Sequence, residues 1–246
     1  MRVLAVYDIH GNVEALEAVL ADPRAAGADV VLVGGDAVPG PFAAETLDRL
    51  EAIRVPVRWL RGNGEREVAE AVGAPAPPPE DLAAVTAALT AAQLGRERAL
   101  ALGGLPLTVE LDGVLYCHAS PRRDDEMLTR LSPPERWAAA LGGAGAALVV
   151  GGHTHQADDR RAGPVPFVNA GSVGLPYEGH ADARWLWVED GVPSPRATAY
   201  DAARAGARML AAGWPDERSL GAALLDPVDP AVVTRIFEEL ARAQGA

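Results

Sequence analysis

The chain has 246 residues, of which 49% are hydrophobic and 23% charged, and its net charge is -12. These are the values of an ordinary soluble globular protein, and no apolar run approaches the roughly 20 residues that span a bilayer. The negative charge disfavours non-specific binding to nucleic acid, which needs clustered positive charge. Because the first predicted strand begins almost at Met1 and Cys117 is the single cysteine, we expect a cytoplasmic protein without a leader or a disulfide.

The first third of the sequence alternates continuous apolar runs with amphipathic stretches. We predict strands at residues 3–7, 30–33 and 55–60, and helices at 13–20 and 43–53. Runs that are apolar throughout indicate strands buried on both faces. Right-handed crossovers through the helices then make the three strands parallel.

The pattern changes between residues 71 and 105. The Pro-rich stretch 74–79 precedes an Ala- and Leu-rich segment, which predicts a helix or a helix pair at 81–102, inserted into the domain. Strands return after this insertion, with a hairpin turn at Asp112-Gly113, and we predict them at 105–111, 114–117, 148–150, 165–168 and 184–188.

The sequence from residue 202 to the end is helical by pattern, with breaks near residues 213–215 and 227–230. We therefore expect one domain over residues 1–200 and a C-terminal helical extension over residues 201–246 that packs on the same domain. The short spacing of the breaks predicts several helices rather than one.

Side chains suited to binding metal ions follow five of the apolar runs. Four of the five histidines belong to three short motifs at or just after predicted strands, and oxygen ligands follow two others. In open α/β sheets, ligands bind outside the carboxyl ends of the strands. The sequence thus predicts a binuclear metal site, with the candidate ligands Asp8, His10, Asp36, Asn63, His118, His153 and His155.

Each motif alone has a structural alternative. Asp8 could cap a turn or helix, the glycines before Asp36 could serve a tight turn, and Asn63 precedes a glycine in a common turn dipeptide. His118 could be a buried histidine with satisfied hydrogen bonds. The Gly-Gly-His-Thr-His motif has few structural uses, and the joint occurrence of all these motifs, each after a strand, favours the metal site.

This series of motifs resembles the calcineurin-like metallophosphoesterase superfamily, and in particular its YfcE-like branch of bacterial and archaeal phosphodiesterases. The resemblance covers about residues 1 to 190 and includes residues 169–174, Asn-Ala-Gly-Ser-Val-Gly, which are similar to the Asn-Pro-Gly-Ser loop of that branch. It implies a four-layer α/β/β/α sandwich, here with a helical insertion at about 71–105 and C-terminal helices.

The resemblance also implies a role for each candidate ligand. One cation would be held by Asp8, His10 and His155, the other by Asn63, His118 and His153, with Asp36 bridging them. Asp36, Asn63 and His118 would then be catalytic. In such sites the ions lie about 3.5 to 4 Å apart, and a bridging water, acidified to hydroxide, attacks phosphorus in line. Nitrogen and oxygen ligands without thiolate suit Mn, Fe, Zn, Ni or Co.

Two positions depart from family patterns. Gly64 stands where many members have a histidine that protonates the leaving group. We therefore expect the hydrolysis of esters with alkyl leaving groups to be slowed most. His180 is a candidate substitute, with a solvated loop histidine as the alternative. The serine/threonine phosphatases have an arginine after the Gly-Asp motif, and Ala37 at this position disfavours a protein phosphatase.

Several other residues have both a functional and a structural interpretation. Four arginines near the motifs could contact phosphate or lie on the surface, namely Arg61, Arg66, Arg122 and Arg123. Cys117 is most simply a small buried hydrophobic residue. Trp185 and Trp187 alternate on one predicted strand and would face the same side, where a core or interface role is favoured over stacking on a base.

These features together predict a metal-dependent phosphoesterase, with phosphodiesterase activity favoured and manganese among the candidate metals. The expected substrate is a small phosphate ester, with nucleotides among the candidates, and the chain could form an oligomer. Neither a membrane nor non-specific nucleic acid is an expected partner. The alternatives are a phosphomonoesterase or protein phosphatase, and a non-catalytic protein-interaction scaffold of the same fold.

Overall fold

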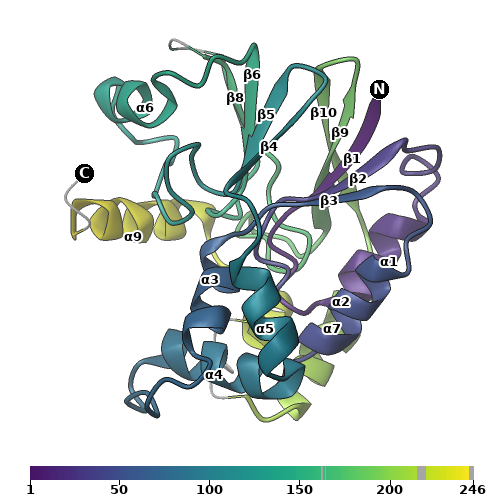
Figure 1. Cartoon of the computed structure of the whole chain (residues 1–246), viewed down its shortest axis with the longest axis vertical. Helices are drawn as coiled ribbons and strands as arrows, with labels where there is room; N and C mark the ends of the chain where they lie inside the picture. The colour runs from purple at the N-terminus through teal and green to yellow at the C-terminus, as the bar shows by residue number, and fades with distance from the viewer. Residues whose placement is uncertain (162, 164, 215–219, 244–246) are drawn as a thin grey trace.

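Two five-stranded sheets form the centre of the computed structural model, which describes residues 1–161, 163, 165–214 and 220–243 (Figure 1). The strands are β1 (Arg2–Val6), β2 (Val30–Val33), β3 (Val57–Trp59), β4 (Thr108–Leu111), β5 (Val114–Cys117), β6 (Leu148–Gly151), β7 (Asp158–Arg160), β8 (Phe167–Asn169), β9 (Ala183–Glu189) and β10 (Val192–Thr198). The first sheet has the order β10-β9-β1-β2-β3 and the second the order β4-β5-β6-β8-β7.

Each sheet contains three neighbouring parallel strands. β1, β2 and β3 are parallel neighbours, as predicted, with Val3 beside Val30 and Val33 beside Trp59. In the second sheet β5, β6 and β8 are parallel. The carboxyl ends of these six strands are therefore the natural place for a site.

Helices cover the outer faces of the two sheets. Within the described residues they are α1 (Val13–Ala21), α2 (Ala43–Glu51), α3 (Asn63–Glu70), α4 (Leu82–Leu94), α5 (Arg96–Gly103), α6 (Pro134–Leu141), α7 (Ala202–Ala211), α8 (Leu220–Leu225) and α9 (Pro230–Ala243). Figure 1 shows α1 and α2 under the first sheet and α6 beside the second. The arrangement confirms the predicted α/β/β/α sandwich.

Three apolar cores hold these layers together. Between the sheets, Tyr7 and Leu186 pack with Tyr116 and Val168 of the opposite sheet. A second core joins α1, α2, α4 and α5 to the outer face of the first sheet, and a third joins α6 to the second sheet through Trp137. Burial of apolar surface at about 25 cal/mol per Å² is the main force that favours this layering.

The insertion contains the two predicted helices, and α3, which precedes it, was not predicted. The Asp81 side chain accepts a hydrogen bond from the Ala84 N–H at 3.1 Å and caps α4. Gly95, with φ of 79°, separates α4 from α5, which confirms the helix pair. α3 was missed because its first residue, Asn63, has the turn sequence Asn-Gly.

Some predicted strands differ from the observed ones. β3 is shorter than predicted and lies at a sheet edge, where Val57 and Trp59 are half-buried and Arg58 is exposed, so burial on both faces was wrong for this strand. α6, β7 and β10 were not predicted from the sequence. β10 contains Pro193 and Pro195, which an edge strand tolerates because one side of it has no ladder partner.

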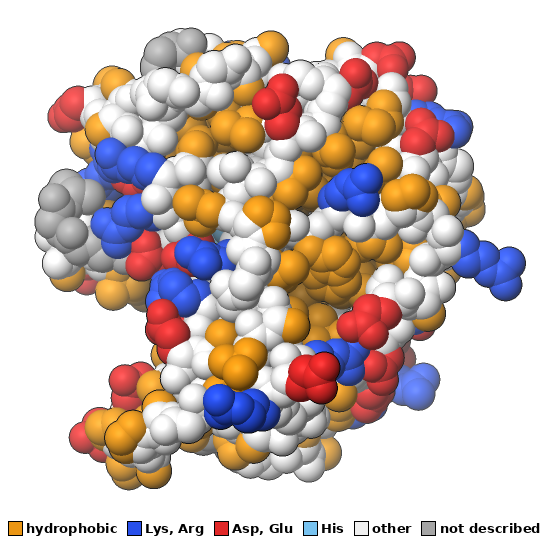
Figure 2. All heavy atoms as spheres, in the orientation of Figure 1, with side chains coloured by type: hydrophobic (Ala, Val, Ile, Leu, Met, Phe, Trp, Pro, Cys, Tyr) orange, Lys and Arg blue, Asp and Glu red, His pale blue; other side chains and the backbone are white. Residues whose placement is uncertain are grey.

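Both tryptophans of β9 belong to the core on the helical side of the first sheet. Trp185 is fully buried there and Trp187 is half-buried against the same cluster, which supports the core interpretation. On the face shown in Figure 2, hydrophobic side chains gather between the first sheet and α5. Trp59, Leu102 and Leu105 line a cavity of about 190 Å³ in this region.

The C-terminal helices pack on one another and on the end of the sandwich. α7 ends near Gly213, with φ of 67°, and α9 begins at Pro230, which agrees with the predicted breaks. Residues 215–219 and 244–246 of the predicted extension lie outside the described residues. Gly206 of α7 and Gly221 of α8 allow their helices to approach closely. In the described part of the chain, no helix is long and apolar enough to cross a membrane.

Candidate metal centre

The seven predicted ligands all lie at strand ends and converge on one place. They follow β1 (Asp8, His10), β2 (Asp36), β3 (Asn63), β5 (His118) and β6 (His153, His155). Two groups have their potential ligand atoms within 4.8 Å of one another: Asp8, His10 and His155 in one, and Asp36, His118 and His153 in the other. The chain thus brings together side chains that are up to 147 residues apart in sequence.

Short distances connect the two groups. In the first, His155 Nε2 lies 3.1 Å from His10 Nε2 and 3.3 Å from Asp8 Oδ1. In the second, His118 Nε2 lies 3.4 Å from Asp36 Oδ2. The same Asp36 oxygen lies 3.7 Å from His10 Nε2, so this carboxylate stands between the groups.

Four of the buried ligand atoms at the centre lack a hydrogen-bond partner. Buried polar atoms in proteins are almost always paired, yet four atoms that point inward have no partner: Asp8 Oδ1, Asn63 Oδ1, His118 Nε2 and His153 Nε2. These are imidazole nitrogens and carbonyl or carboxylate oxygens, the donor set of first-row divalent metals. The residues therefore fit a pair of divalent cations.

Backbone carbonyls orient two of the imidazoles. His118 Nδ1–H donates to Gly34 O at 3.0 Å, and His155 Nδ1–H donates to Leu175 O at 2.8 Å. A carbonyl oxygen only accepts, so in both rings Nδ1 carries a proton and Nε2 is the nitrogen left to face the centre. Such contacts fix the tautomer and orientation of metal-binding histidines.

Much of the ligand backbone has an unfavourable conformation. Positive φ values of 49° to 69° occur at five of the seven candidate ligands, namely Asp8, His10, Asp36, His153 and His155. A left-handed conformation costs a non-glycine residue about 1 to 2 kcal/mol. Strained residues of this kind gather at functional sites, where the surrounding structure holds them in place.

Glu65, which the sequence analysis did not select, holds two of the ligand loops together. Its carboxylate accepts hydrogen bonds from the backbone N–H groups of Asp36 (2.8 Å), Ala37 (2.9 Å), Val38 (3.3 Å) and Gly62 (2.7 Å). The loop after β2 is thereby joined to the loop after β3. The sequence signal was present, since a glutamate three residues after the helix N-cap typically accepts from the N-cap N–H.

A neighbouring glutamate orients Asn63. The Asn63 amide group donates through Nδ2 to Glu67 Oε1 at 3.2 Å. Because a carboxylate accepts, the amide nitrogen faces Glu67 and the oxygen faces the cluster. Asn63 is the first residue of α3 and Glu67 lies one turn later on the same face.

The loop at residues 169–174, which resembles Asn-Pro-Gly-Ser, holds the ligand loops in place through hydrogen bonds to their backbone. Asn169 Nδ2 donates to Gly152 O at 2.7 Å, next to the two histidines of that loop. Ser172 Oγ donates to the Asp8 carbonyl at 2.7 Å. The Asp8 side chain in turn accepts from the His153 N–H through Oδ2 at 3.0 Å, which leaves its other oxygen for the centre.

Burial and mutual charge shift the pKa values of the ligands. Burial opposes the charged form of His118, but Asp36 and Asp8 raise its pKa to about 10. Burial lowers the pKa of His153 to about 4 and also lowers that of His10. Burial opposes ionisation of Asp8, yet His155 and His118 hold its pKa below the ordinary value. Two buried carboxylates therefore remain charged and attract positive charge to the centre.

Position 64 has no room for a side chain. A Cβ atom on Gly64 would lie 2.2 Å from Val38 O, 2.7 Å from Pro39 Cδ and 2.9 Å from Asp36 Oδ1. Its N–H donates to the Asp36 Oδ1 atom at 2.8 Å. The glycine is therefore a consequence of how closely the loop after β2 approaches α3.

The other candidate phosphate contacts lie elsewhere. Arg61 and Arg66 bind Asp124, while Arg122 binds Glu126 and Arg123 binds Asp125. His180 lies beside Arg184 at 2.8 Å and Glu178 at 3.4 Å. None of these five basic residues lines the cavity at the centre, which favours their structural interpretation. Cys117 is fully buried and burial raises the pKa of its thiol.

A cavity of about 380 Å³ opens beside the ligands. Five candidate ligands and Glu67 line it on one side, and α4, α8, α9 and two loops supply the rest. The lining residues are His10, Asp36, Pro39, Asn63, Glu67, Ala83, Thr86, His153, His155, Leu175, Tyr177, Leu220 and Phe237, with Asp36, Asn63 and the histidines as the candidate ligands. A space of this size accommodates a small ligand.

The sandwich and its paired His and Asp clusters define a protein of the metallophosphoesterase type. The model of the calcineurin-like phosphoesterase superfamily domain matches residues 1–187. The chain therefore belongs to this superfamily, as its motifs predicted.

Two solved structures, from Sphaerobacter thermophilus and Pyrococcus horikoshii OT3, share the fold. A metallophosphoesterase from Sphaerobacter thermophilus is 24% identical, with a TM-score of 0.73 over 93% of this chain and 99% of that one. The protein PH1004 from Pyrococcus horikoshii OT3 is 21% identical, with a TM-score of 0.71 over 88% and 95%. The phosphoesterase YfcE from E. coli is 22% identical, with a TM-score of 0.47 over 79% and 91%. A search of curated proteins found no match.

Proposed function

We propose that this protein is a binuclear metal-dependent phosphodiesterase. The observation that carries the proposal is the convergence of buried, unpaired ligand atoms from Asp8, Asn63, His118 and His153 on one centre. Leaving such atoms unpaired costs about 1 to 3 kcal/mol each, and two cations would remove this cost. The membership of the superfamily supports the same conclusion.

The geometry supports a division of the ligands between two cations. Asp8, His10 and His155 would hold the first, and Asn63, His118 and His153 the second. Asp36, which lies near residues of both groups, would contribute to holding both, and the Gly64 N–H orients its carboxylate by donating to Oδ1. When bound, the cations supply Lewis acidity, which lowers the pKa of a water molecule to near neutrality and offsets charge on the phosphoryl oxygens.

The chain's own residues keep this centre in order. Glu65 fixes the loops of Asp36 and Asn63 relative to one another, and Glu67 directs the Asn63 oxygen inward. The carbonyls of Gly34 and Leu175 hold two imidazoles in the ligand tautomer. Orientation of this kind reduces the reorganisation that the reaction requires.

Two features favour a diester with a good leaving group. Gly64 offers no acid to protonate the leaving oxygen, so a weakly basic leaving group reacts best. The described residues of the cavity lining include no Arg or Lys, and Glu67 lies among them. A singly charged diester therefore suits this lining better than a doubly charged monoester, whose extra charge would face the Glu67 carboxylate.

Metal reconstitution tests the proposal. Metal-stripped protein is assayed with Mn, Ni, Co, Zn or Mg on aryl phosphate mono- and diesters that share one leaving group. We expect two bound metal ions per chain and faster turnover of the diester. Asp36→Asn and His153→Ala should lower turnover at least about 100-fold, while His180→Ala, outside the centre, serves as the control.

Two results would overturn the proposal. Full turnover by Asp36→Asn would show that the assigned ligands are not the site. Folded protein that binds no metal would instead favour the non-catalytic scaffold.

A further inference from the structure

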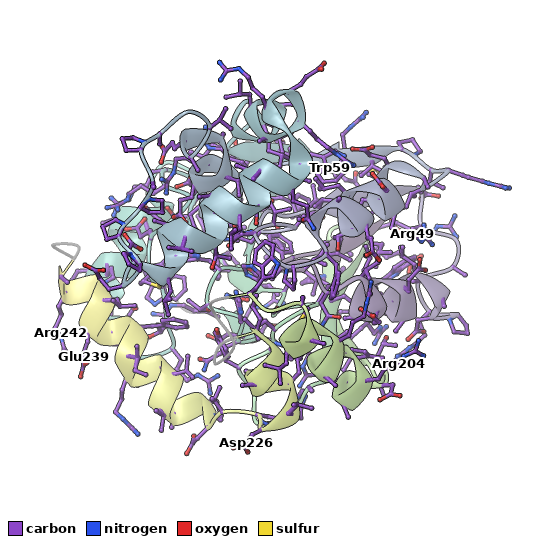
Figure 3. All side chains as sticks on the ribbon, turned by 90° about the horizontal axis from the view of Figure 1, so that it is seen from below. Arg49, Trp59, Arg204, Asp226, Glu239 and Arg242 are labelled. Carbon is purple, nitrogen blue, oxygen red and sulfur yellow. The ribbon has the colours of Figure 1, made fainter. Side chains whose placement is uncertain are left out.

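The cavity at the metal centre is polar on one side and apolar on the other. The apolar wall consists of Leu175 and Tyr177 from the loop after β8, Leu220 of α8 and Phe237 of α9. These side chains come from the C-terminal third of the chain, and Figure 3 shows α8 and α9 beside the end of the sandwich, opposite the helices of the insertion. Asp226, Glu239 and Arg242 point outward there.

An aromatic surface continues from a metal ligand into this wall. The rings of His155 and Tyr177 stack with their centroids 4.8 Å apart and an interplanar angle of 14°. Tyr177 contacts Phe237 at 6.1 Å with an angle of 56°. Both distances are typical of favourable aromatic pairs. A group bound next to the first cation would therefore meet aromatic carbon.

Polar contacts fix α9 in this position without help from Phe237. Gln156, which directly follows His155, contacts the Thr234 hydroxyl at 2.8 Å and donates to Pro230 O at 2.9 Å. At the other end of the helix, Glu238 pairs with Arg136 at 3.0 Å, and both side chains are buried. The wall is thus a built part of the site.

The described lining of the cavity provides no cationic Arg or Lys side chain for a second anionic group. Among the described residues that line the cavity, Asp36 and Glu67 carry carboxylates and none is an Arg or a Lys. A second phosphate group beside this described lining would meet the Glu67 carboxylate or apolar carbon. The described lining therefore disfavours polyphosphates and suits uncharged substituents.

We infer that the wall of Leu175, Tyr177, Leu220 and Phe237 is a substrate subsite for an aromatic substituent of the phosphodiester. The substrate class is then a singly charged diester with an aromatic group close to phosphorus. This inference rests on the proposed phosphodiesterase function, since the metal centre positions the phosphate.

Binding of two non-hydrolysable anions tests the subsite. Methylphenylphosphinate and dimethylphosphinate both carry one negative charge and no ester bond, and they differ in one phenyl group. Calorimetry on protein loaded with two Mn ions should show the phenyl compound binding at least about tenfold more tightly. Phe237→Ala should reduce this ratio about tenfold, and Ile236→Ala, an exposed neighbour on the same helix, should leave it unchanged.

The outcomes distinguish a failure of the aromatic subsite from a failure of the proposed function. Equal binding of both anions by metal-loaded wild type, or an unchanged ratio in folded Phe237→Ala, overturns the subsite while the metal centre stands. Failure to bind two metal ions overturns the proposed function and the subsite together. If Phe237→Ala does not fold, Phe237→Leu keeps the apolar volume and should reduce the ratio about threefold, and an unchanged ratio there also overturns the subsite.

Discussion

Gly64→Ala is a sharp test of why the usual histidine is absent from this site. Alanine at a helical position is more favourable than glycine by about 1 kcal/mol. Here the added Cβ would lie 2.2 Å from Val38 O, and overpacking against backbone costs about 3 kcal/mol at the upper end of its usual range. We therefore expect the free energy of unfolding to fall by about 2 kcal/mol.

Urea unfolding of the metal-free protein, followed by tryptophan fluorescence, measures this change. The matched control is Gly104→Ala, because Gly104 is αR with φ of -82° and its Cβ would lie 3.4 Å from the nearest atom, Ala101 O. The control should change stability by no more than about 0.5 kcal/mol. If the two variants are equally stable, the steric explanation for Gly64 is wrong.

Three further predictions concern buried groups outside the proposed ligand set. Glu65→Gln should lower the free energy of unfolding by about 3 kcal/mol, because an amide NH₂ cannot accept from the backbone N–H groups that Glu65 now binds. Metal analysis should show fewer ions per chain. A normal metal content would contradict the role of Glu65 in holding the two ligand loops together. Burial opposes ionisation of Glu238, but the hydroxyls of Thr129 and Ser132 and the charge of Arg136 hold its pKa below the ordinary 4.5. A pKa that is lower in the folded state contributes stability above the unfolded value and loses it as pH falls, so the stability gap between wild type and Glu238→Gln in urea should be large at neutral pH and narrow below 4.5. Cys117 should resist a thiol reagent in the folded protein and react fully in denaturant; fast labelling of the native chain would refute its burial.

The convergence of the seven candidate ligands could be predicted because local sequence and topology agree for each of them. A continuous apolar run predicts a buried strand, parallel strands collect their carboxyl ends on one edge, and a polar residue after each run must then lie near the others. Gly-Gly-His-Thr-His after β6 shows this most clearly. The spacing of the motifs does not reveal which residues hold the ligand loops in place. Glu65 was therefore missed, although it lies two residues from Asn63.

Other elements were missed because tertiary contacts override their local pattern. β10 has two prolines in seven residues and reads as a loop, yet β9 pairs with it from Val192 to Thr198. β7 is short and polar, with the sequence Asp-Asp-Arg. Both are edge strands, for which the partner strand and not the local propensity decides the conformation.

The contribution of α9 to the site had no signal in the sequence motifs. Phe237 lies outside residues 1–187, the part of the chain that carries the superfamily signature, and it reaches the centre only because Gln156 and Arg136 bind residues on either side of it. The metal centre and the wall of the cavity thus come from different parts of the chain. If the subsite is real, substitutions in α9 should change which ester is bound while the metal content remains that of the wild type, because α9 provides no ligand to either cation.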